Sequence, residues 1–223
     1  MTKTPDGKYV ITGGFDKKLH LIEEANPANR REFQLKYYAY CCHQAGDLLY
    51  IGGMNFIQIF DMAKLVITQT INAGKLIYKI IPIDSGHFLC GGSYILDVLR
   101  LSDLKMIEVC KFETSIYDIA YVARVGDYID YALATWEGVQ FVRINIDQFN
   151  LEILPVRLRE KESINNVQRV RDNVIIFADG SNLILYDRLT DQELLSFWND
   201  SQIRSIKPLW TKAGDLYPPA SST

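Results

Sequence analysis

The sequence has little of what catalytic, metal-binding or membrane-spanning proteins usually display. Its 223 residues include only three histidines, and none of them has a neighbour at the spacing of a metal site or a catalytic triad. No apolar run approaches the roughly eighteen residues of a membrane helix. The N-terminal stretch MTKTPDGKYV contains no long apolar region of the signal-peptide kind. These absences predict a soluble, cytoplasmic protein that is not an enzyme and has no metal and no cofactor.

Cysteine is also scarce, and its placement excludes a disulfide framework. The four cysteines are Cys41, Cys42, Cys90 and Cys110, with no paired spacing. Cys41 and Cys42 are adjacent, so on a strand they point to opposite faces. Cys41-Cys42-His43 offers no second ligand pair for a metal. We expect all four thiols to behave as small apolar side chains in a reducing compartment.

Concentrated charge of one sign is absent as well. The net charge is -3 and charged residues make up 23% of the chain, which argues against nucleic acid as a partner, because phosphate binding needs clustered positive charge. Small basic spots at Arg30-Arg31 and around Arg157 are expected to be solvated. What the chain does contain is 13 Tyr and 10 Phe, residues that favour strands.

Small residue pairs recur along the chain at a nearly constant interval, which is the mark of a structural repeat. Gly13-Gly14, Gly52-Gly53 and Gly91-Gly92 are spaced 39 residues apart, and Ala134-Thr135 and Ala178-Asp179 follow after 43 and 44. A turn such as Asp6-Gly7 or Ala45-Gly46-Asp47 precedes each copy. Upstream of the turns lie apolar pairs three residues apart: Tyr38 and Cys41, Ile77 and Ile80, Ile116 and Ile119, Ile164 and Val167, Ile203 and Ile206.

Each copy has the pattern of four short strands. In the second copy we expect strands over residues 38–43, 48–52, 56–60 and 65–71, separated by turns. The glycines and asparagine of the turns suit the positive φ that tight hairpins require. No segment predicts a helix; residues 157–170 have some helical spacing, but the polar 160–163 favours a loop.

The order of turn, apolar strand, small pair, loop, strand and aromatic-Asp resembles the WD40 repeat over about residues 6–210. The copy NVIIFADGSNLILYD, residues 173–187, is the most similar. No copy has the Trp-Asp dipeptide, whose place is taken by Phe60-Asp61 and Tyr186-Asp187. The resemblance implies an all-β fold, a β-propeller of about five WD40-like four-stranded blades over residues 1–212, with a tail at 213–223. The blades would span about 6–36, 37–73, 74–113, 114–160 and 161–199.

The ends of the repeat array leave two arrangements open. The first copy begins at the Asp6-Gly7 turn, so we expect it to lack its innermost strand. Residues 202–209 would either complete that blade and close a ring of five, or the first blade is partial and the ring is open or belongs to a larger propeller. Pro218-Pro219 ends the strand pattern.

The WD40 arrangement places the loops between second and third strands on one face, together with the starts of the first strands. The predicted partner-binding residues are Phe15, Met54, Tyr78, Tyr94, Tyr117, Trp136 and Arg204. First-strand neighbours on the same face are Tyr40, Lys79, Asp118, Asn165, Asn166 and Ser205. Aromatic, Met and Arg side chains gathered on one rim are typical of interaction hot spots. The alternative is that Phe15 and Trp136 pack between blades.

By analogy with the family, the sequence predicts a non-catalytic scaffold that presents this face to a peptide or a subunit of a larger assembly. The alternative is a propeller that binds a phosphoinositide or a small molecule, which would need a basic pair on a blade rim. A glycosidase-like carboxylate pair, Asp118 with Glu137, is the remaining enzymatic possibility.

Overall fold

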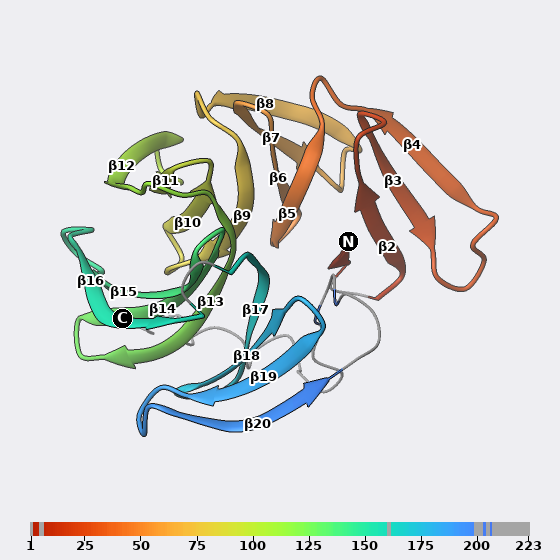
Figure 1. The fold of residues 1–223 in the computed structure, drawn as a ribbon. Helices are drawn as coiled ribbons and strands as arrows, with labels where there is room; N and C mark the ends of the chain where they lie inside the picture. The colour runs from red at the N-terminus through yellow and green to blue at the C-terminus, as the bar shows by residue number, and fades with distance from the viewer. Residues whose placement is uncertain (1, 5–6, 160–161, 199–202, 204–205, 207–223) are drawn as a thin grey trace.

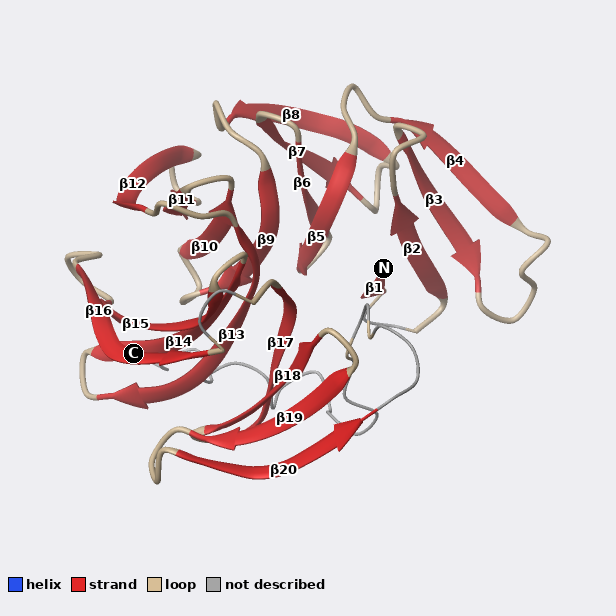
Figure 2. Ribbon diagram, viewed as in Figure 1, coloured by secondary structure: helices blue, strands red, loops and turns tan. Residues whose placement is uncertain are grey.

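The protein folds entirely into β-strands over the residues that the structure describes (Figure 2). The structure is a computed structural model, and it describes residues 2–4, 7–159, 162–198, 203 and 206. No helix occurs in these ranges, so none has the length and apolarity needed to cross a membrane. The expected all-β class is confirmed.

Twenty strands form five separate antiparallel sheets of four strands each. Sheet one contains β1 (Thr2–Lys3), β2 (Tyr9–Gly13), β3 (Lys18–Glu23) and β4 (Arg30–Gln34). Sheet two contains β5 (Ala39–Ala45), β6 (Leu48–Gly53), β7 (Phe56–Asp61) and β8 (Val66–Asn72). Sheet three contains β9 (Ile77–Pro82), β10 (His87–Gly92), β11 (Ile95–Arg100) and β12 (Lys105–Lys111). Sheet four contains β13 (Ile116–Val125), β14 (Tyr128–Thr135), β15 (Gly138–Asn145) and β16 (Leu151–Leu158). Sheet five contains β17 (Ile164–Arg171), β18 (Val174–Asp179), β19 (Asn182–Asp187) and β20 (Gln192–Trp198).

The strands follow one another in chain order within every sheet, and the first strand of each lies innermost (Figure 1). In the second repeat every observed strand boundary lies within two residues of the expected one. Turn residues Gly7, Gly46, Gly126 and Asn173 have φ between 57° and 68°, as the sequence suggested; Gly86 is not among the positive-φ residues, and its N–H donates to Asp84.

The first sheet corrects one expectation. Its innermost position is filled by β1, whose two residues pair with Val10 and Ile11 of β2. The first repeat therefore does not lack an innermost strand, although the strand precedes the turn where we placed the start. The expected strand at 202–209 lies outside the described residues except for Ile203 and Ile206. Within the described chain no strand pairing joins sheet five to sheet one.

Four apolar clusters fill the spaces between consecutive sheets, and the small residues of the repeat explain how closely the sheets approach. A Cβ on Gly91 would lie 2.8 Å from Ile119 Cδ1 and 2.9 Å from Ile116 Cγ2, both on the first strand of the next sheet. A Cβ on Gly52 would meet Ile77 at 2.8 Å. The small residue thus leaves room for the apolar pair of the following repeat to pack against it.

The cysteines pack as expected. Cys41 contacts the cluster between sheets two and three, and Cys42 contacts the cluster between sheets one and two, so the two thiols do face opposite ways. Cys90 is fully buried, and none of the four cysteines forms a disulfide.

Candidate functional site

A β-bulge near the start of the first strand recurs in sheets two to five. In each case the register between the first and second strands shifts, so that one or two residues of the first strand fall between paired positions. The skipped residue is Tyr40 in β5, Tyr78 in β9 and Tyr117 in β13. In β17 the pairing skips Asn165 and Asn166. The bulge therefore takes the skipped side chains out of the regular alternation at the same place in four sheets.

The second small residue of the repeat faces the chain segment that enters the bulged strand. A Cβ on Gly53 would lie 2.0 Å from the carbonyl oxygen of Tyr38, and one on Gly92 would lie 1.9 Å from that of Leu76. Only glycine allows the entering chain to approach so closely. Gly52-Gly53 and Gly91-Gly92 thus have two separate roles, one toward the next sheet and one toward this entering segment.

The bulged residues meet at a central cavity of about 400 Å³ between the innermost strands. Four sheets contribute to its wall. The lining residues that the argument uses are Tyr40, Tyr78, Tyr117, Lys79, Asp118 and Gln168. Asn165, Asn166 and Ile206 lie on the same wall. The cavity is rich in hydroxyl and amide groups, so it can form several hydrogen bonds to one occupant.

The rings at this end of the molecule form a continuous row across four sheets. Phe15, in the loop between β2 and β3, lies 5.4 Å from Tyr40, measured between ring centroids. Tyr40 lies 5.4 Å from Tyr78, and Tyr78 lies 5.4 Å from Tyr117. These are edge-to-face or tilted contacts, the favoured geometry of aromatic pairs. The row gives the face a rigid apolar strip beside the polar cavity.

The loops between second and third strands place exposed side chains along this row, and Phe15 is one of them. Phe15 is 72% exposed and Trp136, between β14 and β15, is 62% exposed. Tyr94, between β10 and β11, is also exposed, and so is Met54 between β6 and β7. Phe15 and Trp136 are therefore mostly exposed, although the Phe15 ring also contacts Tyr40 of sheet two.

Tyr94 is held in a backbone conformation that bulky residues rarely adopt, with φ of 63°. A left-handed conformation costs an L-residue about 1 kcal/mol, whereas glycine would have no such cost. Leu65 and Leu104 adopt the same conformation in turns at the other end of the sheets, so at Tyr94 it reflects the tight turn that presents this exposed ring.

Asp118 joins three sheets at the bottom of the site. Its Oδ1 lies 2.6 Å from Lys79 Nζ of sheet three, and its Oδ2 accepts the Val167 N–H of sheet five at 3.2 Å and the Gln168 Nε2 at 3.4 Å. The side chain is buried. Since its oxygens are taken up by these contacts, Asp118 holds neighbouring sheets in register around the cavity.

The pKa values of three groups that line the cavity, and of His43 on the neighbouring part of β5, are shifted away from neutral pH. Burial raises the pKa of Tyr40 and of Tyr117, and neighbouring tyrosines add to the rise. Burial raises the pKa of Cys41 to about 12. Burial, with a contribution from Lys79, lowers the pKa of His43 to about 4. At neutral pH these groups are uncharged, so they can donate or accept hydrogen bonds but are not poised as nucleophile or base.

Six of the seven predicted partner-binding residues lie on this one face: Phe15, Met54, Tyr78, Tyr94, Tyr117 and Trp136. Arg204 lies outside the described residues. Gln168 was not foreseen, and Tyr40 was placed only among the neighbours. The spacing of the apolar pairs held a signal for both: residues on one face of a regular strand are two apart, so two buried residues three apart indicate a bulge between them.

The described chain contains no group of three or more His, Cys, Asp or Glu side chains arranged to hold a metal ion. The hypothesis of a catalytic carboxylate pair, Asp118 with Glu137, is less well supported, because Asp118 already contacts Lys79 and accepts a hydrogen bond from sheet five. A scan against models of protein families gave no match, and a search of curated proteins found no relative. The site is therefore interpreted from its own geometry.

Proposed function

We propose that the five sheets are blades of an open WD40-like propeller that acts as a non-catalytic scaffold. Its ligand is a segment of a protein partner, bound across the face defined by Phe15, Tyr78, Tyr94, Tyr117 and Trp136. The observation that carries the proposal is the bulge repeated in four first strands. Four departures from regular pairing at the same place in the repeat aim side chains into one cavity, while the apolar residues on either side of each bulge, such as Ile116 and Ile119, pack against the preceding sheet.

The composition of the face supports a peptide rather than a charged polymer. Its exposed groups are aromatic rings and one methionine, the residues that dominate binding energy at protein interfaces. The cavity beside them offers phenol and amide groups for a peptide backbone or a polar side chain. A net charge of -3 gives little attraction for nucleic acid. Four cysteines that form no disulfide are consistent with a cytoplasmic location.

The second candidate is a small polar molecule bound in the cavity itself. A volume of about 400 Å³ is within the range of small-molecule sites. A phosphoinositide is less well supported, because Arg30 pairs with Glu32 at 2.9 Å and Arg31 lines a different cavity, between sheets one and two.

Selection of peptides from a displayed random library against the immobilised chain tests the main proposal. Peptides selected on the wild type should lose about 30-fold or more in affinity for the double variant Tyr117→Ala and Trp136→Ala, the loss expected for a hot spot. The matched control is Tyr128→Ala, which removes a ring that is 44% exposed from the β13–β14 turn at the opposite end of the same sheet.

Two results decide the outcome. Urea unfolding must show that the double variant keeps its fold. If the selected peptides then bind the double variant as well as they bind the wild type, the face is wrong. If a library yields peptides that Tyr128→Ala loses and the double variant keeps, the interaction lies at the other end of the sheets.

A further inference from the structure

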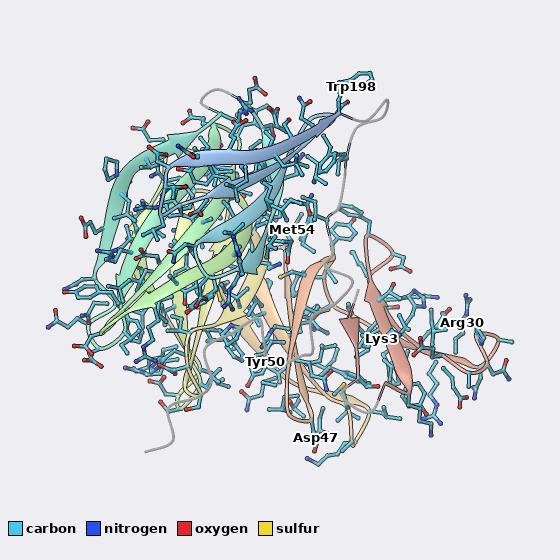
Figure 3. All side chains as sticks on the ribbon, turned by 90° about the horizontal axis from the view of Figure 1, so that it is seen from below. Lys3, Arg30, Asp47, Tyr50, Met54 and Trp198 are labelled. Atoms are coloured by element: carbon cyan, nitrogen blue, oxygen red, sulfur yellow. The ribbon has the colours of Figure 1, made fainter. Side chains whose placement is uncertain are left out.

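The outermost strand of sheet five, β20, differs from the other outer strands in the side chains that it exposes. All seven residues of β20 are exposed, and the last five are Leu-Leu-Ser-Phe-Trp. Trp198 is 72% exposed and, in Figure 3, projects away from the sheets at the end of the strand. Among the residues that the structure describes, no strand pairs with the outer edge of β20, and an edge of this kind offers N–H and C=O groups to a strand that approaches.

Three of the other four outer strands carry features that discourage such pairing. β4 begins Arg-Arg-Glu, β12 has charges at both ends and in the middle, and β16 contains Pro155. β8 has no charge and no proline; four of its seven residues are Thr, Gln or Asn, and the others are Val66, Ile67 and Ile71. Charged side chains and proline are common protections of an edge strand. Residues 194–198 of β20 have neither.

The face of sheet five turned away from sheet four is apolar as well. Register places Ile176, Leu185 and Leu195 in one cross-strand row. Leu183 and Phe197 lie side by side in the next row. The opposite face of the sheet packs into the cluster shared with sheet four. The apolar surface around β20 thus continues from the strand edge onto one whole face.

Sheet one does not supply a partner for that surface. Its free face carries Glu32, which contacts Lys18 at 2.6 Å, Arg30 at 2.9 Å and His20 at 3.5 Å. Packing the apolar face of sheet five onto this network would desolvate several charged groups, a cost that their mutual pairing only partly offsets. The charged face of sheet one is therefore a poor match for this apolar surface.

We propose that β20 is a self-association edge, along which two copies of this chain pair antiparallel about a two-fold axis at Ser196. This register sets Leu195 opposite the partner's Phe197 and Leu194 opposite the partner's Trp198. Ser196 faces its own counterpart, a pair that can hydrogen-bond. No like charges oppose each other over residues 194–198. The two apolar faces merge into one surface across eight strands, and the closed two-fold symmetry is the commonest among protein oligomers.

Light scattering coupled to size exclusion, over a series of chain concentrations, tests the proposal. The wild type is expected to approach twice the 25.6 kDa of the single chain as its concentration rises. Leu195→Lys should keep it monomeric. Ile153→Lys is the matched control, since Ile153 is 52% exposed on the outer strand of sheet four and Leu195 is 46% exposed. The control should dimerise like the wild type.

A charge-exchange pair then tests the identity of the occupant and the register. Ser196→Lys and Ser196→Glu should each be monomeric, because like charges then meet at the two-fold axis. An equimolar mixture of the two should restore the dimer. A wild type that stays monomeric at every concentration overturns the proposal, as does a dimer that persists in Leu195→Lys. Failure of the mixture to recover, with both variants folded, overturns the register at Ser196.

Discussion

Asp97 is a buried carboxylic acid whose environment opposes its charge. It lies on β11 with 5% of its surface exposed, among the isoleucines and leucines that pack against sheet two. Its Oδ1 accepts no hydrogen bond from the described residues. Burial raises the pKa of Asp97 from 3.8 to about 6; Lys75 opposes this shift, and Glu108, paired opposite in β12, adds to it.

The sign of the resulting pH dependence follows from proton linkage. Between pH 3.8 and about 6 the folded chain holds this proton and the unfolded chain has released it. Stability contributed by protonated Asp97 is therefore present at low pH and is lost as pH rises through that window. A shift of about two pH units corresponds to about 3 kcal/mol, at about 1.4 kcal/mol per unit.

Asp97→Asn should remove this loss, because the amide is neutral at every pH. Near pH 4 the variant should be slightly less stable than the wild type, since one amide N–H group would lack a partner. Its stability relative to the wild type should then rise by about 3 kcal/mol as pH increases to about 7. Urea unfolding followed by tryptophan fluorescence at several pH values measures the difference directly.

Asp130→Asn is the control, because Asp130 is equally buried but is held by Arg143 through two contacts of 2.7 and 2.9 Å. That change should destabilise the chain at neutral pH, where Asp97→Asn stabilises it. A difference between Asp97→Asn and the wild type that stays constant from pH 4 to 7 would refute the reasoning, since it would mean that Asp97 titrates alike in the folded and unfolded chains.

Three other changes have definite expected outcomes. Gly92→Ala should lower the free energy of unfolding by about 3 kcal/mol or more, because its Cβ would meet the Leu76 carbonyl at 1.9 Å and neither backbone can yield cheaply; urea unfolding measures it. Asp118→Asn should cost about 2 kcal/mol by breaking the 2.6 Å contact with Lys79, and hydrogen exchange should show faster opening of β9 and β17 than of β2. His43→Gln should gain stability relative to the wild type as pH falls from 6.5 to about 4, because the unfolded histidine takes up a proton there and the folded one does not; a pH series of urea midpoints that runs parallel for both chains would contradict this.

The repeat made the strands predictable with good accuracy. Small pairs, turns and apolar pairs occurred in one phase, and each marks a position where only certain residues fit: Gly52 against Ile77, or Gly46 with φ of 57°. Such positions leave a local signal in the sequence because the constraint acts on a single residue. The loop residues of the candidate site followed from the same register.

The bulges and the first strand were harder to foresee. Thr2 and Lys3 have no apolar alternation, and their pairing with β2 arises only because the chain folds back beside Val10 and Ile11. The bulge at Tyr78 depends on backbone pairing between β9 and β10. The three-residue spacing of Ile77 and Ile80 marks the bulge in the sequence. The pairing of β1, however, is set by a partner that the chain reaches only by folding back, so composition and periodicity carry little information about it.

The charged contacts were not predictable for a related reason. Nothing in the sequence near Asp118 indicates that Lys79 and Val167 will reach it from two other sheets. The shifted pKa of Asp97 likewise depends on the burial of one residue among apolar neighbours. An aspartate in an apolar run is visible in the sequence, but whether it is paired or isolated is decided by packing between sheets.

The two proposed surfaces have a fixed geometric relation that limits what a dimer can do. The candidate face lies at the end where first strands begin, and β20 runs toward that same end. Antiparallel pairing of β20 with a second copy reverses its direction, so the two candidate faces must point to opposite sides of the dimer. One short peptide could not contact both, and the dimer would gain no avidity for it. It would instead hold two partners apart. Leu195→Lys should therefore leave the affinity of a selected peptide unchanged while it abolishes the dimer, and the Tyr117 and Trp136 double variant should do the reverse.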